Sequence, residues 1–329
     1  MSFKYIIGHK SAKKILQKQI KSSRVSHAYL FTGREGIGKK TLAIQFAKAL
    51  FCRQIVSDSC DSCITCRKIE HYNHPDLKSI EIEEDSKQLK IDQIREMQRT
   101  LAYKPYEGER KVYIIDDADH MTSQAANSLL KTLEEPPSYA TIILLAEDIN
   151  KILPTVFSRC QHIKLSAISK SKIKDLLIDK GIKKDKIEIL SRLANGSPGQ
   201  ALRLSSEEEL FSQREEVLSF LIKLQKIDSV KLFEFVDIMV KLYKQGFPLF
   251  DLLSNWYHDI MMYKQDSESN DIINYDYRKN IIEEVNSYNI NELISILNLI
   301  NKYQQYIDHN VRKDLVLQVL LLKIRNKRV

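Results

Sequence analysis

The chain has 329 residues, with 51 lysines and arginines against 43 aspartates and glutamates, a formal net charge of +8. This length exceeds the usual size of one domain, so we expect two or three domains, each able to bury a core. No run of 18 or more apolar residues is present and the N-terminal segment lacks the apolar core of a secretory signal, so we expect a soluble, cytoplasmic protein with no membrane partner. The charge is moderate and its runs mix both signs, which favours a solvated surface, with contact to nucleic-acid phosphates as the alternative.

Short apolar runs and amphipathic segments alternate through the first half of the chain. The apolar runs predict strands, and the segments with apolar residues every three or four positions predict helices. The predicted strands are 27–32, 77–82, 111–115 and 141–146, and the predicted helices are 40–51, 91–101 and one beginning at Ser123. Thr122 is the expected N-cap of the last helix, which Pro136 should end. The alternation predicts an α/β fold, a mostly parallel sheet covered by helices on both faces.

The pattern changes after Leu165, where helical periodicity replaces the alternation. Three short helices are expected around a glycine-rich turn, at 171–177, 187–194 and 199–204. Long amphipathic segments then predict an all-α domain, in which Trp256, Tyr257, Met261 and Met262 are expected in the core rather than at a contact surface. We therefore expect three domains, at 1–165, 166–207 and 208–329.

Three of the nine glycines, Gly33, Gly36 and Gly38, lie between the first predicted strand and the helix that follows it. Glycines in this setting let successive backbone N–H groups face a phosphate, with the positive end of the helix behind them. Lys39 is placed to contact the outer phosphates. The spacing fits the phosphate loop G-x-x-x-x-G-K-[ST] except at its last position.

Lys40 stands at the position where a phosphate loop supplies a hydroxyl to Mg²⁺. An ammonium cannot be a ligand for a cation. The nearest hydroxyl, that of Thr41, lies one residue after the motif position and points about 100° further round the helix. The sequence therefore indicates the fold of a nucleotide site and argues against catalysis in it.

Asp116 and Asp117 end the third predicted strand, which places them at the carboxyl edge of the sheet beside the glycine loop. In a nucleotide hydrolase one such carboxylate holds Mg²⁺ and the other orients the attacking water. The alternative is a strand that ends in an ordinary polar turn. Asp117 is one methylene shorter than the glutamate expected of an active hydrolase.

Four closely spaced cysteines follow the glycine loop, in the pattern C-x7-C-x2-C-x2-C formed by Cys52, Cys60, Cys63 and Cys66. Four thiolates can close a tetrahedral Zn²⁺ site, and such a site is structural because no ligand position stays open. Disulfides are the alternative, which the expected cytosolic location disfavours. His71 and His74 lie nearby as alternative ligands.

These features occur in an order that resembles the bacterial clamp-loader subunits of DNA polymerase III, members of the AAA+ fold family. The resemblance covers about residues 5–205. It rests on the segment 27–31, the glycine loop, the four cysteines, Asp116-Asp117, and the segments 129–137, 158–160 and 196–199. It implies an AAA+ core with a small helical lid and an all-α collar at about 211–324.

The family contains an ATP-hydrolysing gamma/tau type and a delta prime type. This chain departs from the motor type at four places: Lys40, Asp117, Ala146-Glu147 where a polar sensor is expected, and Gly199 where a sensing arginine is expected. These departures indicate the delta prime type, which has no ATPase activity of its own. Whether ATP or ADP binds at the degenerate site is not decided by the sequence. The alternative within the family is a gamma/tau-like motor.

In the family, an arginine in the position of Arg159 reaches the γ-phosphate of ATP held by a neighbouring subunit. The resemblance implies gamma/tau and delta subunits as partners, with the sliding clamp and primer-template DNA met through the assembled complex. On its own, Arg159 reads as a surface arginine. A small-molecule P-loop kinase with a zinc lid and a sequence-specific DNA-binding protein are the other classes, and no motif in the chain supports either.

Overall fold

The computed structural model describes residues 2–206, 208–266, 272–308 and 311–326. Its chain divides into two compact units, one of 1–176 with 195–200 and one of 177–194 with 201–329. Within the described ranges, none of the helices combines the length and the apolar character needed to cross a bilayer. The predicted domain boundaries near 165 and 207 stay predictions.

The first unit is built on a five-stranded sheet in which every neighbouring pair is parallel. In chain order the strands are β1 (Ala28–Thr32), β2 (Leu77–Ile80), β3 (Lys111–Ile115), β4 (Ala140–Ala146) and β5 (Gln161–Lys164), and across the sheet they run β2-β3-β4-β1-β5. The predicted parallel α/β sheet is confirmed. Since all strands point the same way, their carboxyl ends meet at one edge, which carries the candidate site.

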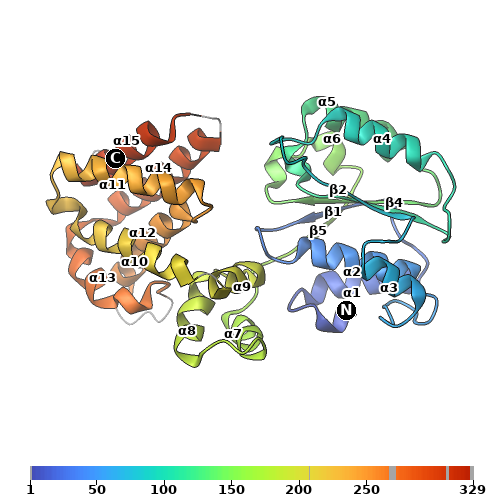
Figure 1. Ribbon diagram of the computed structural model, residues 1–329, viewed down its shortest axis with the longest axis horizontal. Coiled ribbons are helices and arrows are strands. Elements are labelled where there is room, and N and C mark those ends of the chain that lie inside the picture. Colours follow the sequence, from blue (N-terminus) through green and yellow to red (C-terminus); the bar gives the residue numbers. More distant parts are fainter. Residues whose placement is uncertain (1, 207, 267–271, 309–310, 327–329) are drawn as a thin grey trace. The chain divides into compact units, whose positions relative to one another are not determined.

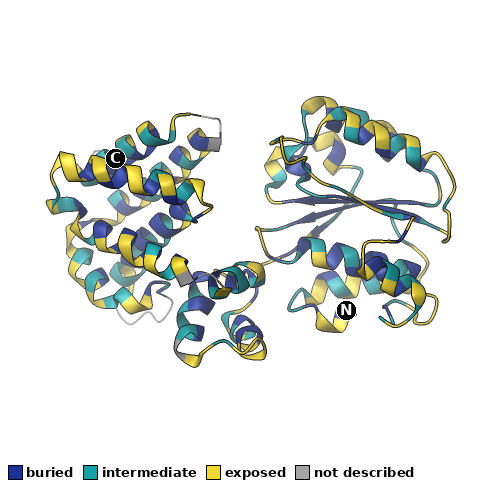
Figure 2. Ribbon diagram, in the orientation of Figure 1, coloured by how far each residue is buried: buried dark blue, intermediate teal, exposed yellow. Residues whose placement is uncertain are grey.

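The three central strands β1, β3 and β4 are buried along their whole length, as Figure 2 shows. Their sequences are nearly continuous apolar runs, as expected for parallel strands covered on both faces. β5 was not predicted. Its sequence Gln-His-Ile-Lys is mostly polar, and it forms an edge strand because it pairs with β1.

Helices cover both faces of the sheet (Figure 1). One face carries α1 (Lys10–Lys21), α2 (Lys39–Phe51) and α3 (Ile64–Glu70), and the other carries α4 (Ile91–Leu101), α5 (Ser123–Glu134) and α6 (Pro154–Phe157). The Thr122 side chain accepts a hydrogen bond from Ala125 N at 3.2 Å, which confirms the predicted N-cap of α5. That helix ends two residues before Pro136, as predicted.

The rest of the described chain is helical, as predicted. The helices are α7 (Lys170–Asp179), α8 (Lys184–Leu193), α9 (Pro198–Ser206), α10 (Glu208–Lys223), α11 (Ser229–Lys244), α12 (Leu249–Gln265), α13 (Arg278–Glu284), α14 (Ile290–Asp308) and α15 (Lys313–Arg325). Trp256 and Tyr257 are each 1% exposed, which confirms that they are core residues. Met261 and Met262 are half-buried.

Candidate functional site

The glycine loop joins β1 to the first turn of α2, in the setting that a phosphate loop requires. Gly36 (φ 67°) and Gly38 (φ 103°) adopt left-handed conformations that disfavour any other residue. The loop is tied to the neighbouring strand β4 because Gly33 N donates a hydrogen bond to Ala146 O at 3.2 Å. The predicted strand, loop and helix of a nucleotide site are therefore present.

Lys39 is buried in the loop and its ammonium is already satisfied there. Its Nζ donates to Gly33 O at 2.7 Å and to Arg34 O at 3.2 Å, and pairs with the Glu147 carboxylate at 3.3 Å. Burial raises the pKa of Glu147, although the Lys39 charge opposes the shift. The amine expected to meet outer phosphates thus rests against carbonyls and a carboxylate at the end of β4.

Lys40 bridges two carboxylates at the carboxyl edge of the sheet. Its Nζ lies 2.8 Å from Glu81 Oε1, just beyond β2, and 3.1 Å from Asp116 Oδ2, at the end of β3. Burial alone would lower the pKa of Lys40, but the hydrogen bonds that its ammonium donates to Glu81 and Asp116, together with their charges, outweigh burial and raise that pKa. A positive charge of the chain itself therefore neutralises Asp116, the carboxylate expected to hold Mg²⁺.

Asp117 and Thr41 are the other residues expected around the nucleotide site. Asp117 has a left-handed backbone (φ 49°), and burial together with the charge of Asp116 raises its pKa. Thr41 is exposed on the first turn of α2. With a lysine in place of the hydroxyl and Asp116 paired to it, positions 40 and 116 do not fit the Mg²⁺ ligands of a phosphate-loop hydrolase.

The turn at 196–199 packs directly on the glycine loop. Gly199 N donates to Gly36 O at 2.9 Å, and the Ser197 hydroxyl donates to Glu35 O at 2.9 Å. A Cβ on residue 199 would lie 2.8 Å from the Gly36 Cα, so an arginine at this position would force the turn away from the loop. Close packing against the glycine loop therefore favours glycine at position 199.

Arg159 lies just beyond α6, near the surface of the first unit. Its guanidinium pairs with Glu134 Oε1 at 2.7 Å and donates to Thr155 O at 3.0 Å, and its side chain is 35% exposed. Glu134 is the last residue of α5. The neighbouring Cys160 is set apart from the other cysteines, and burial raises the pKa of its thiol to about 12.

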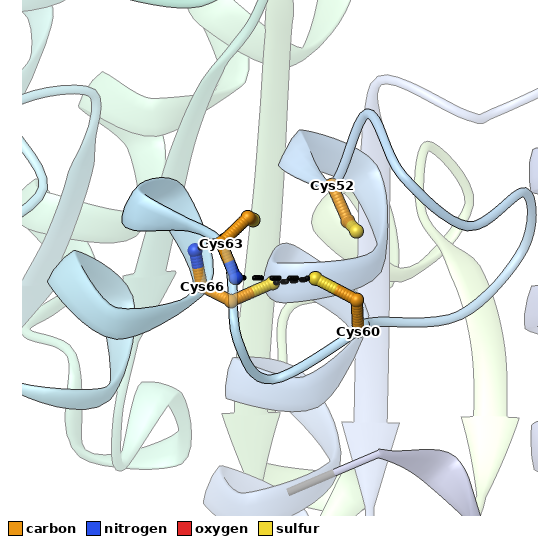
Figure 3. A group of neighbouring side chains, drawn as sticks. All are labelled: Cys52, Cys60, Cys63 and Cys66. Carbon is orange, nitrogen blue, oxygen red and sulfur yellow. Dashed lines mark hydrogen bonds between the residues drawn. The ribbon is translucent and has the colours of Figure 1, made fainter.

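The four remaining cysteines gather between the end of α2 and the start of α3, as Figure 3 shows. Their sulfur atoms all lie within 4.8 Å of one another, and the sulfurs of Cys60 and Cys66 are 3.9 Å apart. Backbone N–H groups of Cys63 and Cys66 donate to the sulfurs of Cys60 and Cys63, at 3.3 and 3.4 Å. Such donors stabilise thiolates, so the cluster can bind a metal ion.

The two nearby histidines lie outside this cluster. His74 is buried, its Nδ1 accepts a hydrogen bond from Asp76 N at 3.2 Å, and its ring packs on Phe51. His71 is exposed at the end of α3. Neither joins the four cysteines within the described residues, so the sulfur set stands as the candidate ligand set.

The contacts of three carboxylates were missed in the sequence: those of Glu81, Glu134 and Glu147. Glu81 could have been found, because it directly follows β2 and parallel strands end at a common edge. Glu147 was noted only as a departure from a polar sensor, and its pairing with Lys39 joins residues 108 positions apart. Nothing in the local pattern of α5 shows that Glu134 meets Arg159.

Comparison with known proteins places the chain in a family. A family model described as "DNA polymerase III, delta subunit" matches residues 8–169, and one described as "DNA polymerase III, delta subunit, C terminal" matches residues 208–326. The chain belongs to the clamp-loader subunit family of DNA polymerase III. The resemblance to clamp-loader subunits that the sequence motifs indicate is thereby confirmed.

Individual relatives agree on the family and do not separate its members. The chain is 37% identical to DNA polymerase III subunit delta′ of Bacillus subtilis, over 62% of this chain and 61% of that protein. It is also 37% identical to the gamma subunit of Buchnera aphidicola (from Acyrthosiphon pisum), over 61% of this chain and 57% of that protein. The matches thus span less than two thirds of these relatives. A gamma subunit-related structure from Thermotoga maritima is 20% identical, with a TM-score of 0.45, over 97% of this chain and 99% of that one.

Proposed function

We propose that the chain is the delta-prime-type, non-hydrolysing subunit of a bacterial replicative clamp loader, and that it donates Arg159 to an ATP site on a neighbouring subunit. The observation that carries the proposal is the pairing of the Lys40 ammonium with Asp116 at 3.1 Å and Glu81 at 2.8 Å. Phosphoryl transfer depends on Mg²⁺ and on positioned charges. A chain that fills its own metal position with a lysine lacks the first of these.

Arg159 suits a role in trans. A guanidinium is permanently charged and planar, and its fork can neutralise the charge that develops on a transferred phosphoryl group. In the isolated chain it rests on one half-exposed carboxylate, Glu134. Partly exposed ion pairs of this kind contribute about 0–1 kcal/mol to stability. Breaking the Arg159–Glu134 pair so that the guanidinium can bind a phosphate on a neighbouring subunit therefore costs little.

The cysteine cluster fits a structural Zn²⁺ ion held by Cys52, Cys60, Cys63 and Cys66. When bound, the ion would supply a cross-link and no chemistry, because four thiolates complete its coordination. Cys52 directly follows α2, Cys60 lies in the loop after it, Cys63 directly precedes α3, and Cys66 lies in the first turn of α3. The ion would therefore fix α3 to the helix that follows the glycine loop.

The partners of such a subunit are gamma/tau and delta subunits, with the sliding clamp and primer-template DNA reached through the complex in the cytoplasm. The all-α region 208–329 would form the collar through which the subunits assemble. The second candidate is a gamma/tau-like motor, which the 37% identity to a gamma relative favours equally. The two candidates differ in whether the chain hydrolyses ATP.

Two measurements on the full chain test the proposal. The first is co-purification with the gamma/tau and delta subunits of the same cell, followed by the native mass of the complex; we expect a complex that contains this chain. The second is phosphate release from ATP by the chain alone, which we expect to equal that of a Lys39→Ala variant. Steady turnover that Lys39→Ala abolishes would establish the motor instead, and failure to join the complex would remove the assignment.

A further inference from the structure

The first 34 residues carry positive charge without any negative charge. They contain no aspartate or glutamate and eight basic residues: Lys4, Lys10, Lys13, Lys14, Lys18, Lys21, Arg24 and Arg34. The first acidic residue of the chain is Glu35. This segment departs from the mixed charge runs found elsewhere, and the proposed function makes no use of it.

Helix α1 gathers half of these charges into one row. At about 100° per residue, Lys10, Lys14, Lys18 and Lys21 fall within an arc of about 80°. All are exposed, and the opposite face buries Ala12 and Leu16 against the rest of the first unit. We call Lys10, Lys14, Lys18 and Lys21 the lysine row.

The positive charge of this face is not neutralised within the described chain. Among the described residues, no ion pair or hydrogen bond involves the side chain of any lysine of the row. The neighbouring Lys13 and Lys172 add to the charge of the row. Burial, followed by the charges of Lys172 and Lys10, lowers the pKa of Lys13, which indicates crowding of like charges.

We propose that the lysine row of α1 is a docking surface for the phosphate backbone of duplex DNA. Its four ammonium groups would bind phosphates without reading sequence, because lysine contacts to phosphates position a protein and carry no base information. The proposal goes beyond the function proposed above, since it concerns a contact made by this subunit itself and does not involve Arg159 or the glycine loop.

The composition of the row favours DNA over an acidic protein partner. Protein–protein interfaces are depleted in lysine and are built around aromatic, methionine and arginine anchors. Helix α1 contains no aromatic residue, methionine or arginine, and its exposed large apolar side chain, Ile15, lies at the flank of the row. A surface of flexible, strongly hydrated charges is suited to counterion release from a phosphate backbone.

The dimensions of the row also fit a duplex. Lys10, Lys14 and Lys18 follow one another at about 6 Å along the helix, and the row from Lys10 to Lys21 extends about 17 Å. Duplex DNA carries one charge for about every 1.7 Å of its axis, so a groove wall or strand of that length offers phosphates to all four lysines.

Fluorescence anisotropy with a labelled random duplex of about 20 base pairs tests the proposal, with salt varied from about 50 to 200 mM. The full chain is compared with the variant K10Q/K14Q/K18Q/K21Q, which removes the row while keeping helix propensity. The matched control is K180Q/K183Q/K184Q/K241Q, which removes the same charge from exposed lysines of the second unit. Circular dichroism melting checks that both variants fold.

We expect the row variant to bind the duplex at least about tenfold more weakly at low salt. A plot of the logarithm of its binding constant against the logarithm of the salt concentration should have a slope shallower by about 3 to 4 than that of the unchanged chain. The control should keep most of the affinity and slope of the unchanged chain. Equal binding by the row variant and the control, or no binding by the unchanged chain at low salt, would overturn the proposal. Loss of subunit assembly with unchanged DNA binding would identify the row as a protein interface and would also overturn it. Assembly and ATPase measurements on the same variant separate this result from the role of Arg159.

Discussion

In the function that we propose, the Lys40 ammonium takes the place of the Mg²⁺ ion that a hydrolase holds beside its phosphate loop. The side chain pairs with Glu81 and Asp116, which follow two adjacent strands of the sheet. The charge compensation that a motor obtains from a metal ion is supplied here by the chain itself. Removing that ammonium should therefore free Asp116 for a cation.

Lys40→Thr is the direct test at the residue scale. The variant supplies the missing hydroxyl and releases Asp116, so we expect binding of a fluorescent ATP analogue to become at least about tenfold tighter in Mg²⁺ than in EDTA. The unchanged chain should show no Mg²⁺ dependence. Lys40→Ala is the control, since it frees the carboxylate without adding a ligand and should respond less. A Mg²⁺-dependent unchanged chain would refute our interpretation of Lys40.

Asp76 gives a second prediction at this scale, on stability. It is 2% exposed, and its carboxylate accepts the N–H groups of Tyr106, Glu107 and Gly108 at 2.6, 2.8 and 3.0 Å. Burial would raise the pKa of Asp76, but these three hydrogen bonds outweigh it and lower that pKa. Its contribution to stability is therefore complete above the unfolded-state pKa of about 4, and is lost as the pH falls through the lower folded-state pKa.

We expect Asp76→Asn to lower the free energy of unfolding by about 2 kcal/mol near neutral pH, because the ionised acceptor is lost. Urea unfolding over a pH series should show this deficit shrinking below about pH 4. Asp85→Asn, at an exposed position, should change stability by less than about 0.5 kcal/mol. A deficit that is independent of pH would show that the ionised form of Asp76 has no special role.

At the scale of elements, the apolar strands and the long amphipathic helices could be predicted from the sequence. β3 matches the predicted range 111–115 because it is a nearly continuous apolar run, and α4 matches 91–101 because its apolar residues recur with a helical period. β5 was missed, because a short polar segment becomes a strand only through its pairing with β1. The Lys40–Glu81 contact joins residues 41 positions apart, and only the parallel alignment of β2 with β3 brings Glu81 to the lysine.

The cysteine cluster carries the prediction that belongs to this scale. Protein purified without chelator should contain about one zinc ion per chain by elemental analysis, and Cys63→Ser should lose it and melt at a lower temperature. Cys160→Ser is the matched control, since Cys160 lies apart from the cluster and should leave the zinc content unchanged. Clearly less than one metal ion per chain in the unchanged protein would count against a four-cysteine zinc site.

Across the whole chain, a five-stranded parallel sheet is combined with a helical region that the family model for the C-terminal domain matches. The sequence motifs were sufficient to predict the family and the parallel sheet. They could not show what the residues around the glycine loop and Arg159 contact, because those contacts form between distant segments: the Ser197–Gly199 turn on the glycine loop, Lys40 on Asp116, and Arg159 on Glu134.

In the function that we propose, a subunit unable to hydrolyse ATP completes the active site of another subunit. ATPase turnover of the reconstituted complex carrying Arg159→Ala tests it most directly, with native mass measured on the same sample and Arg159→Lys alongside to separate charge from the planar fork. We predict an intact complex whose turnover falls at least about tenfold, equivalent to roughly 1.4 kcal/mol of barrier, with lysine restoring only part of it. Unchanged turnover in a fully assembled Arg159→Ala complex would contradict the account.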